Sequence, residues 1–183
     1  SGDAITLVTS HNFVNQATTP FALTGGGRWL IYSTNPASIT LNGLTGSFNR
    51  YSCSYAGGCP TGVSIPTSGN GFIYSYTPYL TITPTAQSVT YGDAATLNGY
   101  GYAATSSDYL SAADRTADVL SGTLVGTTDY SVGDNIGSYH LNYASGALLS
   151  SLGYGFIYAD NASAITVGQR TLTVTLTGAV NKV

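Results

Sequence analysis

The chain has 183 residues, a formal net charge of −3 and only 7% charged residues, against about 25% in an ordinary soluble domain. Its four Arg and single Lys form no basic cluster, which argues against nucleic acid as a partner. No apolar run approaches the roughly 18 residues of a membrane-spanning helix. Glu and Met are absent, whereas Thr, Ser, Gly, Val, Ile and Tyr dominate, so the composition predicts an all-β fold.

The first part of the chain alternates strand-like and loop-like segments. The segments AITLVTS (4–10), PFALTG (20–25) and RWLIYS (28–33) are rich in β-branched and aromatic residues and predict strands. The glycine run at 25–27 and the region 42–70 predict long loops.

Two cysteines frame the segment CSYAGGC at residues 53–59. The short spacing and the two glycines between them favour a Cys53–Cys59 disulfide formed in an oxidising compartment, with about 2–2.5 kcal/mol of stabilisation in the chain-entropy model. The alternatives are two free thiols, or two zinc ligands for which only His11 and His140 are available as partners.

The tetrapeptide Gly-Phe-Ile-Tyr occurs twice, at 71–74 and at 155–158, each time after a Gly-X-Gly turn. A repeat this long matches a small domain better than a solenoid unit. We therefore expect two tandem β modules, 1–83 and 84–168, with 169–183 as the first strand of a further, truncated module. An immunoglobulin-like sandwich is favoured, and a β-grasp-like arrangement is the alternative for the second module because of a predicted helix.

That helix is predicted over 111–119, where apolar residues recur at helical spacing. Ser111 and Asp114 match a capping box with Asp in place of Glu, and Gly122 is the predicted stop. Elsewhere GFIYSY (71–76), SYHLNYA (138–144) and RTLTVTLTG (170–178) alternate with the period of a strand that buries one face, as in antiparallel sheets.

Several of these segments resemble a known family. GGRWLIYSTNPAS (26–38) resembles a segment of bacterial filamentous-haemagglutinin-like large exoproteins, the secreted partners of two-partner secretion systems. VTYGDAATL (89–97), DVLSGTL (118–124), VGDNIGSYHL (132–141) and ITVGQRTLTVT (165–175) are similar to the MBG type, a mostly-β, Gly-rich module, and LTGAVNKV (176–183) looks like the lead-in to a Tyr-Asp-Gly module. The CSYAGGC insertion departs from the pattern. The resemblance implies a surface-exposed or released fibrous adhesin whose modules act as stalk or binding units, and it brings no catalytic residues.

Residue chemistry gives no enzyme signature. There is no G-x-S-x-G motif, and His140 on the exposed face of a strand is interpreted as solvated. The carboxylates of Asp114 and Asp118 are interpreted as cap and solubility groups rather than a glycosidase pair. Asp129 and Asp134 beside Gly133 are weak calcium candidates for which turn roles are favoured. No cofactor is expected.

Aromatic residues beside Gly-rich loops are candidates for contact with a ligand, either a carbohydrate or a protein, although tyrosines more often fill β cores. These candidates are Trp29, Tyr51, Tyr55, Tyr100 and Tyr102, with Tyr55 foremost because it lies at the tip of the cysteine loop.

The alternating segment near the C-terminus offers a second interaction surface. Leu172, Val174 and Leu176 would form one face of a strand with few charges to protect its edge, suited to pairing with a neighbouring module or another chain. The expected function is therefore a non-catalytic, extracellular or cell-surface stalk or presenting module. The alternatives are a self-assembling fibre subunit and a carbohydrate-binding module.

Overall fold

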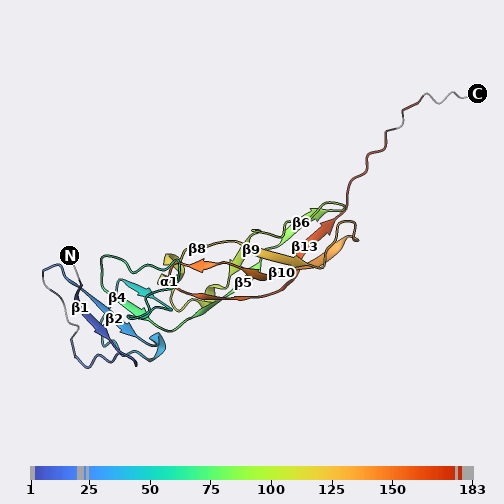
Figure 1. The fold of residues 1–183 in the computed structure, drawn as a ribbon. Coiled ribbons are helices and arrows are strands. Elements are labelled where there is room, and N and C mark those ends of the chain that lie inside the picture. Colours follow the sequence, from blue (N-terminus) through green and yellow to red (C-terminus); the bar gives the residue numbers. More distant parts are fainter. Residues whose placement is uncertain (1–2, 20–22, 24, 176, 179–183) are drawn as a thin grey trace, which may run out of the picture.

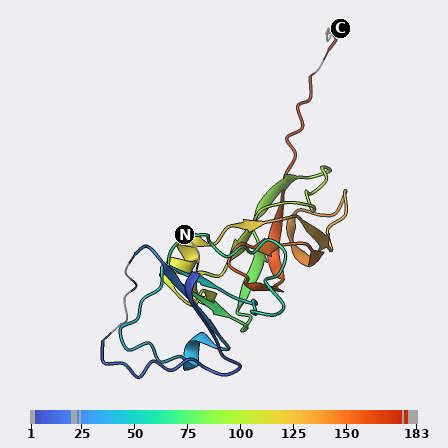
Figure 2. The same cartoon turned by 60° about the vertical axis from the view of Figure 1, so that its left-hand side comes forward.

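The computed structural model describes residues 3–19, 23, 25–175 and 177–178. It confirms the all-β class, because the described residues form several small sheets and one α-helix. The molecule is elongated (Figure 1). One end holds the strands β1 (Asp3–Val8), β2 (Arg28–Ser33) and β4 (Gly71–Tyr74), and the other end holds β6 (Gln87–Thr90) and β13 (Asn161–Gly168). The same two ends stay apart when the view is turned (Figure 2).

The N-terminal sheet is parallel throughout. Its order is β1 (Asp3–Val8), β2 (Arg28–Ser33), β4 (Gly71–Tyr74) and β3 (Phe48–Arg50). Four of the six residues of β2 and all of β4 are buried, because side chains on both faces of the sheet pack into hydrophobic clusters. The prediction of a one-face-buried, antiparallel strand is therefore wrong for GFIYSY.

The remaining described residues form three further sheets. Strand β10 pairs antiparallel with both β9 and β13, as predicted for SYHLNYA. The pairs β5–β7 and β8–β11 are also antiparallel, whereas β13 with β6 and β5 with β12 are parallel. In β10 the predicted alternation is confirmed, since Leu141 and Tyr143 are buried and His140 is exposed. The bounds are β5 (Tyr79–Pro84), β6 (Gln87–Thr90), β7 (Tyr102–Ala104), β8 (Leu120–Ser121), β9 (Leu124–Thr128), β10 (Gly137–Gly146), β11 (Leu149–Ser150), β12 (Gly155–Tyr158) and β13 (Asn161–Gly168).

The predicted helix exists and is shorter than expected. Helix α1 (Ala112–Ala117) begins after Ser111, whose side chain accepts a hydrogen bond from the backbone N–H of Asp114. The helix ends with Asp118 as its C-cap, so the predicted stop at Gly122 is wrong. Two 3-10 turns, η1 (Pro36–Ser38) and η2 (Ser106–Asp108), complete the helical structure of the described residues.

The main hydrophobic core draws side chains from both sides of residue 84. Trp29 and Phe72 from the N-terminal sheet belong to the same cluster as Leu124 and Tyr143. A second cluster around Ile165 lies in the β6–β13–β10–β9 sheet. The module boundary near 84, at the last residue of β5, stays a prediction.

The predicted assembly strand is not paired in the structure. Leu172 and Val174 are 81% and 77% exposed, and residues 169–175 form no strand. Leu176 lies outside the described residues, as does most of the predicted strand PFALTG.

Candidate functional site

The disulfide loop is anchored to the buried strand β4. Cys53 and Cys59 are joined by a disulfide, and the Cys53 backbone N–H donates to the Tyr74 carbonyl over 2.9 Å. Inside the loop the backbones of Ser54 and Gly58 exchange two hydrogen bonds of 2.8 and 2.9 Å. Because hydrogen bonds join the loop to β4 and also link Ser54 to Gly58 within it, the loop holds the residue at its tip in a fixed position.

That residue is Tyr55, whose side chain is 63% exposed. Its ring meets the ring of Tyr32 from β2 edge to face, with centroids 5.3 Å apart and planes at 80°. This is a favoured geometry for aromatic pairs. The two rings therefore form an aromatic corner on the surface of the N-terminal sheet.

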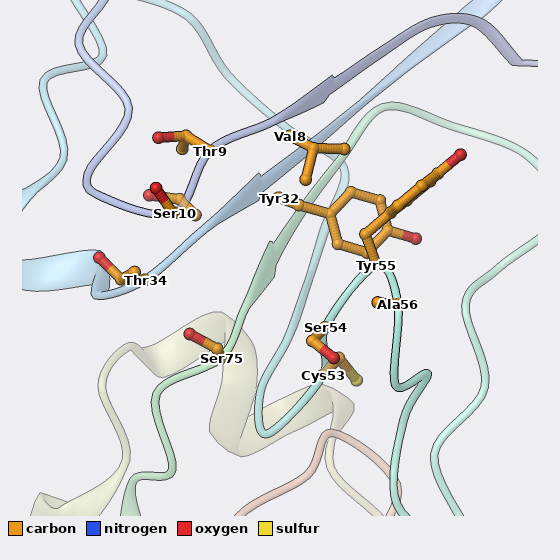
Figure 3. Close-up of a pocket in the computed structure, with 11 residues that line it drawn as sticks. Val8, Thr9, Ser10, Tyr32, Thr34, Cys53, Ser54, Tyr55, Ala56 and Ser75 are labelled. Atoms are coloured by element: carbon orange, nitrogen blue, oxygen red, sulfur yellow. The ribbon is translucent and has the colours of Figure 1, made fainter.

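A groove of about 330 Å³ lies beside this corner (Figure 3). We call it the tyrosine groove, and its lining residues are 8–10 from the end of β1, 32–34 from the end of β2, 53–56 from the disulfide loop, and Ser75 after β4. Three parallel strands that end side by side bring these segments together.

The groove is lined by hydroxyl groups, two aromatic rings and the apolar side chains of Val8 and Ala56, and it carries no Asp, Arg, Lys or His. The hydroxyls of Tyr32, Tyr55 and Ser75 make no hydrogen bond to any residue that the structure describes. Burial, followed by the negative charge of Asp3, raises the pKa of Tyr32. The Tyr32 hydroxyl therefore keeps its proton and remains a hydrogen-bond donor at neutral pH.

Of the five aromatic candidates from the sequence, only Tyr55 lines this groove. Trp29 and Tyr51 are each 1% exposed in the main core, so their prediction as contact residues is corrected: the sheet and its neighbours cover their rings. Tyr100 donates its hydroxyl hydrogen to the Ala86 carbonyl, and Tyr102 packs against the core from β7. Tyr32 and Ser75 were missed, because only the folded sheet places them in the same groove as Tyr55.

A buried carboxylate contacts two tyrosines of the main core. Asp114 is 4% exposed, which corrects its interpretation as a solubility group. One of its oxygens accepts from the hydroxyls of Tyr51 and Tyr154 over 2.7 and 3.2 Å, and the other accepts from the Asn49 amide over 3.3 Å. Asp118 accepts from Ser150, Ser151 and the Leu152 N–H. Both acids therefore fasten α1 to distant segments of the chain.

The remaining polar candidates lie far along the chain from the disulfide loop. His140 is half-exposed, and its Nδ1 is 2.8 Å from a carboxylate oxygen of Asp160, a partner that the sequence did not reveal. Asp129 accepts from the His140 backbone N–H, and Asp134 accepts from the Ser131 N–H. Within the described residues, no three His, Cys, Asp or Glu side chains come together as metal ligands.

The described helices include none that is long and apolar enough to cross a membrane. Comparisons with protein-family models, with curated proteins and with solved structures found no match to this chain.

Proposed function

We propose that this protein is a non-catalytic adhesive module of an extracellular or cell-surface bacterial protein, and that it presents the Tyr55 loop to a partner. The observation that carries the proposal is the exposure of Tyr55, 63%, on a loop closed by a disulfide and bonded to a buried strand. Large exposed aromatic side chains in fixed positions are typical of contact surfaces.

The architecture supports a presenting role. The N-terminal sheet packs into the same core as the strands β5, β9 and β10, so the groove belongs to an elongated body rather than to a separate flexible arm (Figure 1). The resemblance of GGRWLIYSTNPAS to a segment of filamentous-haemagglutinin-like exoproteins supports the same proposal. A disulfide within the loop suits an oxidising compartment outside the cell.

Adhesion of the purified chain tests this function directly. Fluorescent microspheres coated with the chain are applied to a panel of cultured cells and bacterial cells, and adherent beads are counted. We expect adhesion above that of albumin-coated beads, lost on Tyr55→Ala and retained on Tyr91→Ala, which removes a 43% exposed tyrosine outside the groove. Adhesion no better than albumin on every surface would contradict the proposal.

Self-assembly is a second candidate function, favoured by the exposure of Leu172 and Val174 on an unpaired, extended segment. Alternating Leu, Val and Thr suit addition to the open edge of another sheet. Sedimentation of the wild-type chain against the Leu172→Lys, Val174→Lys double variant tests it. Oligomers that the double variant abolishes would support assembly, and a wild-type chain that stays monomeric at high concentration would exclude it.

A further inference from the structure

We propose that the tyrosine groove binds a neutral carbohydrate of one or two sugar rings, packed on the Tyr55–Tyr32 corner. The inference rests on the proposed presenting function and names the chemistry of the partner. It follows from the shape of the aromatic corner, the unpartnered hydroxyls, the charge of the lining and the size of the groove.

The aromatic corner offers an apolar surface of the right form. A pyranose ring has a face of C–H bonds that packs on the electron-rich face of an aromatic ring. The exposed Tyr55 ring stands nearly perpendicular to Tyr32, so one sugar contacts two walls at once (Figure 3). The disulfide loop holds Tyr55 in this position before a ligand arrives, which lowers the entropic cost of binding.

The polar groups of the groove match those of a sugar. A hydroxyl both donates and accepts hydrogen bonds, and every free hydroxyl of a sugar does the same. The hydroxyls of Tyr32, Tyr55 and Ser75 have no partner among the described residues. They therefore remain available to a ligand without breaking any bond within the protein.

The charges around the groove disfavour an anionic ligand. None of the lining side chains carries a charge at neutral pH, so a carboxylate or sulfate would lose its hydration without gaining a counter-charge. The nearby acid, Asp3, is already paired with Arg28, and its negative charge still acts on Tyr32. An anionic sugar is therefore disfavoured relative to a neutral one.

The volume of the groove sets the size of the ligand. At about 330 Å³ it lies near the lower limit of small-molecule sites, which run from about 300 to 1,000 Å³. One or two sugar rings fill such a space, and any longer chain would continue into solvent.

A glycan array of neutral, sialylated and sulfated sugars, probed with the full chain, identifies the ligand. Titration calorimetry with the best neutral glycan then measures the effect of each groove residue. We expect Tyr55→Ala to weaken binding at least tenfold, because the ring is lost. Tyr55→Phe and Ser75→Ala each remove one hydroxyl and should each weaken binding about two- to tenfold. Tyr91→Ala is the control and should bind as the wild type does. Equal melting temperatures of the variants separate lost contacts from lost folding.

The outcomes separate this inference from the proposed function. Binding only to anionic glycans, binding that Tyr55→Ala leaves unchanged, or no glycan binding at all would overturn the carbohydrate assignment. If bead adhesion then survives periodate oxidation of the target surface, the partner is not a glycan and the adhesive function stands. If neutral glycans bind at Tyr55 but beads adhere to nothing, the carbohydrate site stands and the adhesive function fails.

Discussion

The two Gly-Phe-Ile-Tyr segments form strands of identical length but contrasting environment. Strand β4 lies between the parallel strands β2 and β3, and all four of its residues are buried. Among the described strands, β12 is hydrogen-bonded only to β5, and its Ile157 is 54% exposed whereas Ile73 of β4 is 0% exposed. The tetrapeptide therefore determines a strand, and the number of neighbouring elements determines how much of it is buried.

The glycine of each segment has the same role in both places. A Cβ at Gly71 would lie 2.1 Å from the Phe48 ring, and a Cβ at Gly155 would lie 2.7 Å from the Tyr79 ring. Each strand thus begins where a neighbouring aromatic ring covers the backbone. This shared packing gives a physical reason for the glycine in both copies.

Truncating the isoleucine should give the largest difference between the two strands. Ile73→Ala leaves a cavity beside Leu30 and Cys53 and should lower the free energy of unfolding by about 2–5 kcal/mol. Ile157→Ala removes a half-exposed side chain and should cost about 0.5 kcal/mol. Urea unfolding followed by circular dichroism measures both, and equal losses would show that burial does not distinguish the strands.

The all-β class and the helix at 111–119 were predictable because they rest on local composition and periodicity. The direction of the N-terminal sheet was not. A strand with period two in its side chains fits parallel and antiparallel sheets alike, and only the burial of both faces, seen in β2 and β4, distinguishes them.

The candidate site was predictable only where the signal was local. The disulfide and the exposure of Tyr55 follow from seven consecutive residues. The partners Tyr32 and Ser75 come from separate strands, so no spacing in the sequence links them to Tyr55. Trp29 lies beside a glycine run, which suggested exposure, but its strand is interior to the sheet.

A methyl group added at each glycine should affect the two strands differently. Gly71→Ala should destabilise by about 1–3 kcal/mol, because the Phe48 ring is partly buried and held beneath Arg50. Gly155→Ala should cost less, because Tyr79 is 53% exposed and its ring swings into solvent. Thermal unfolding compares the two variants.

A second substitution identifies the cause of that effect. Phe48→Leu shortens the side chain that the new methyl group meets, so the double variant Gly71→Ala, Phe48→Leu should lose less stability than the two single changes added together. Strict additivity of the two changes would mean that the glycine is needed for a reason other than the Phe48 ring.

The tyrosines of the two segments should also differ in alkali. Burial, followed by the charge of Asp114, raises the pKa of Tyr74 from 10.0 to about 12. Burial also raises the pKa of Tyr158, but this residue is only partly buried and no carboxylate contributes to the rise. In the unfolded chain both phenols ionise near their ordinary pKa. The stability that neutral Tyr74 contributes is therefore complete below pH 10 and is lost as the pH rises towards 12.

Urea unfolding at a series of pH values between 9 and 12 measures this loss. Tyr74 keeps its proton to a higher pH in the folded state than in the unfolded state, and Tyr74→Phe removes this difference. The free energy of unfolding of Tyr74→Phe should therefore fall less steeply with pH than that of the wild type. Tyr158→Phe should change the slope less, because its folded environment is closer to water. If Tyr158→Phe changed the slope of the free energy of unfolding against pH more than Tyr74→Phe does, the core around Asp114 would open before its tyrosines ionise. The contrast in burial between β4 and β12 would then not persist under alkaline conditions.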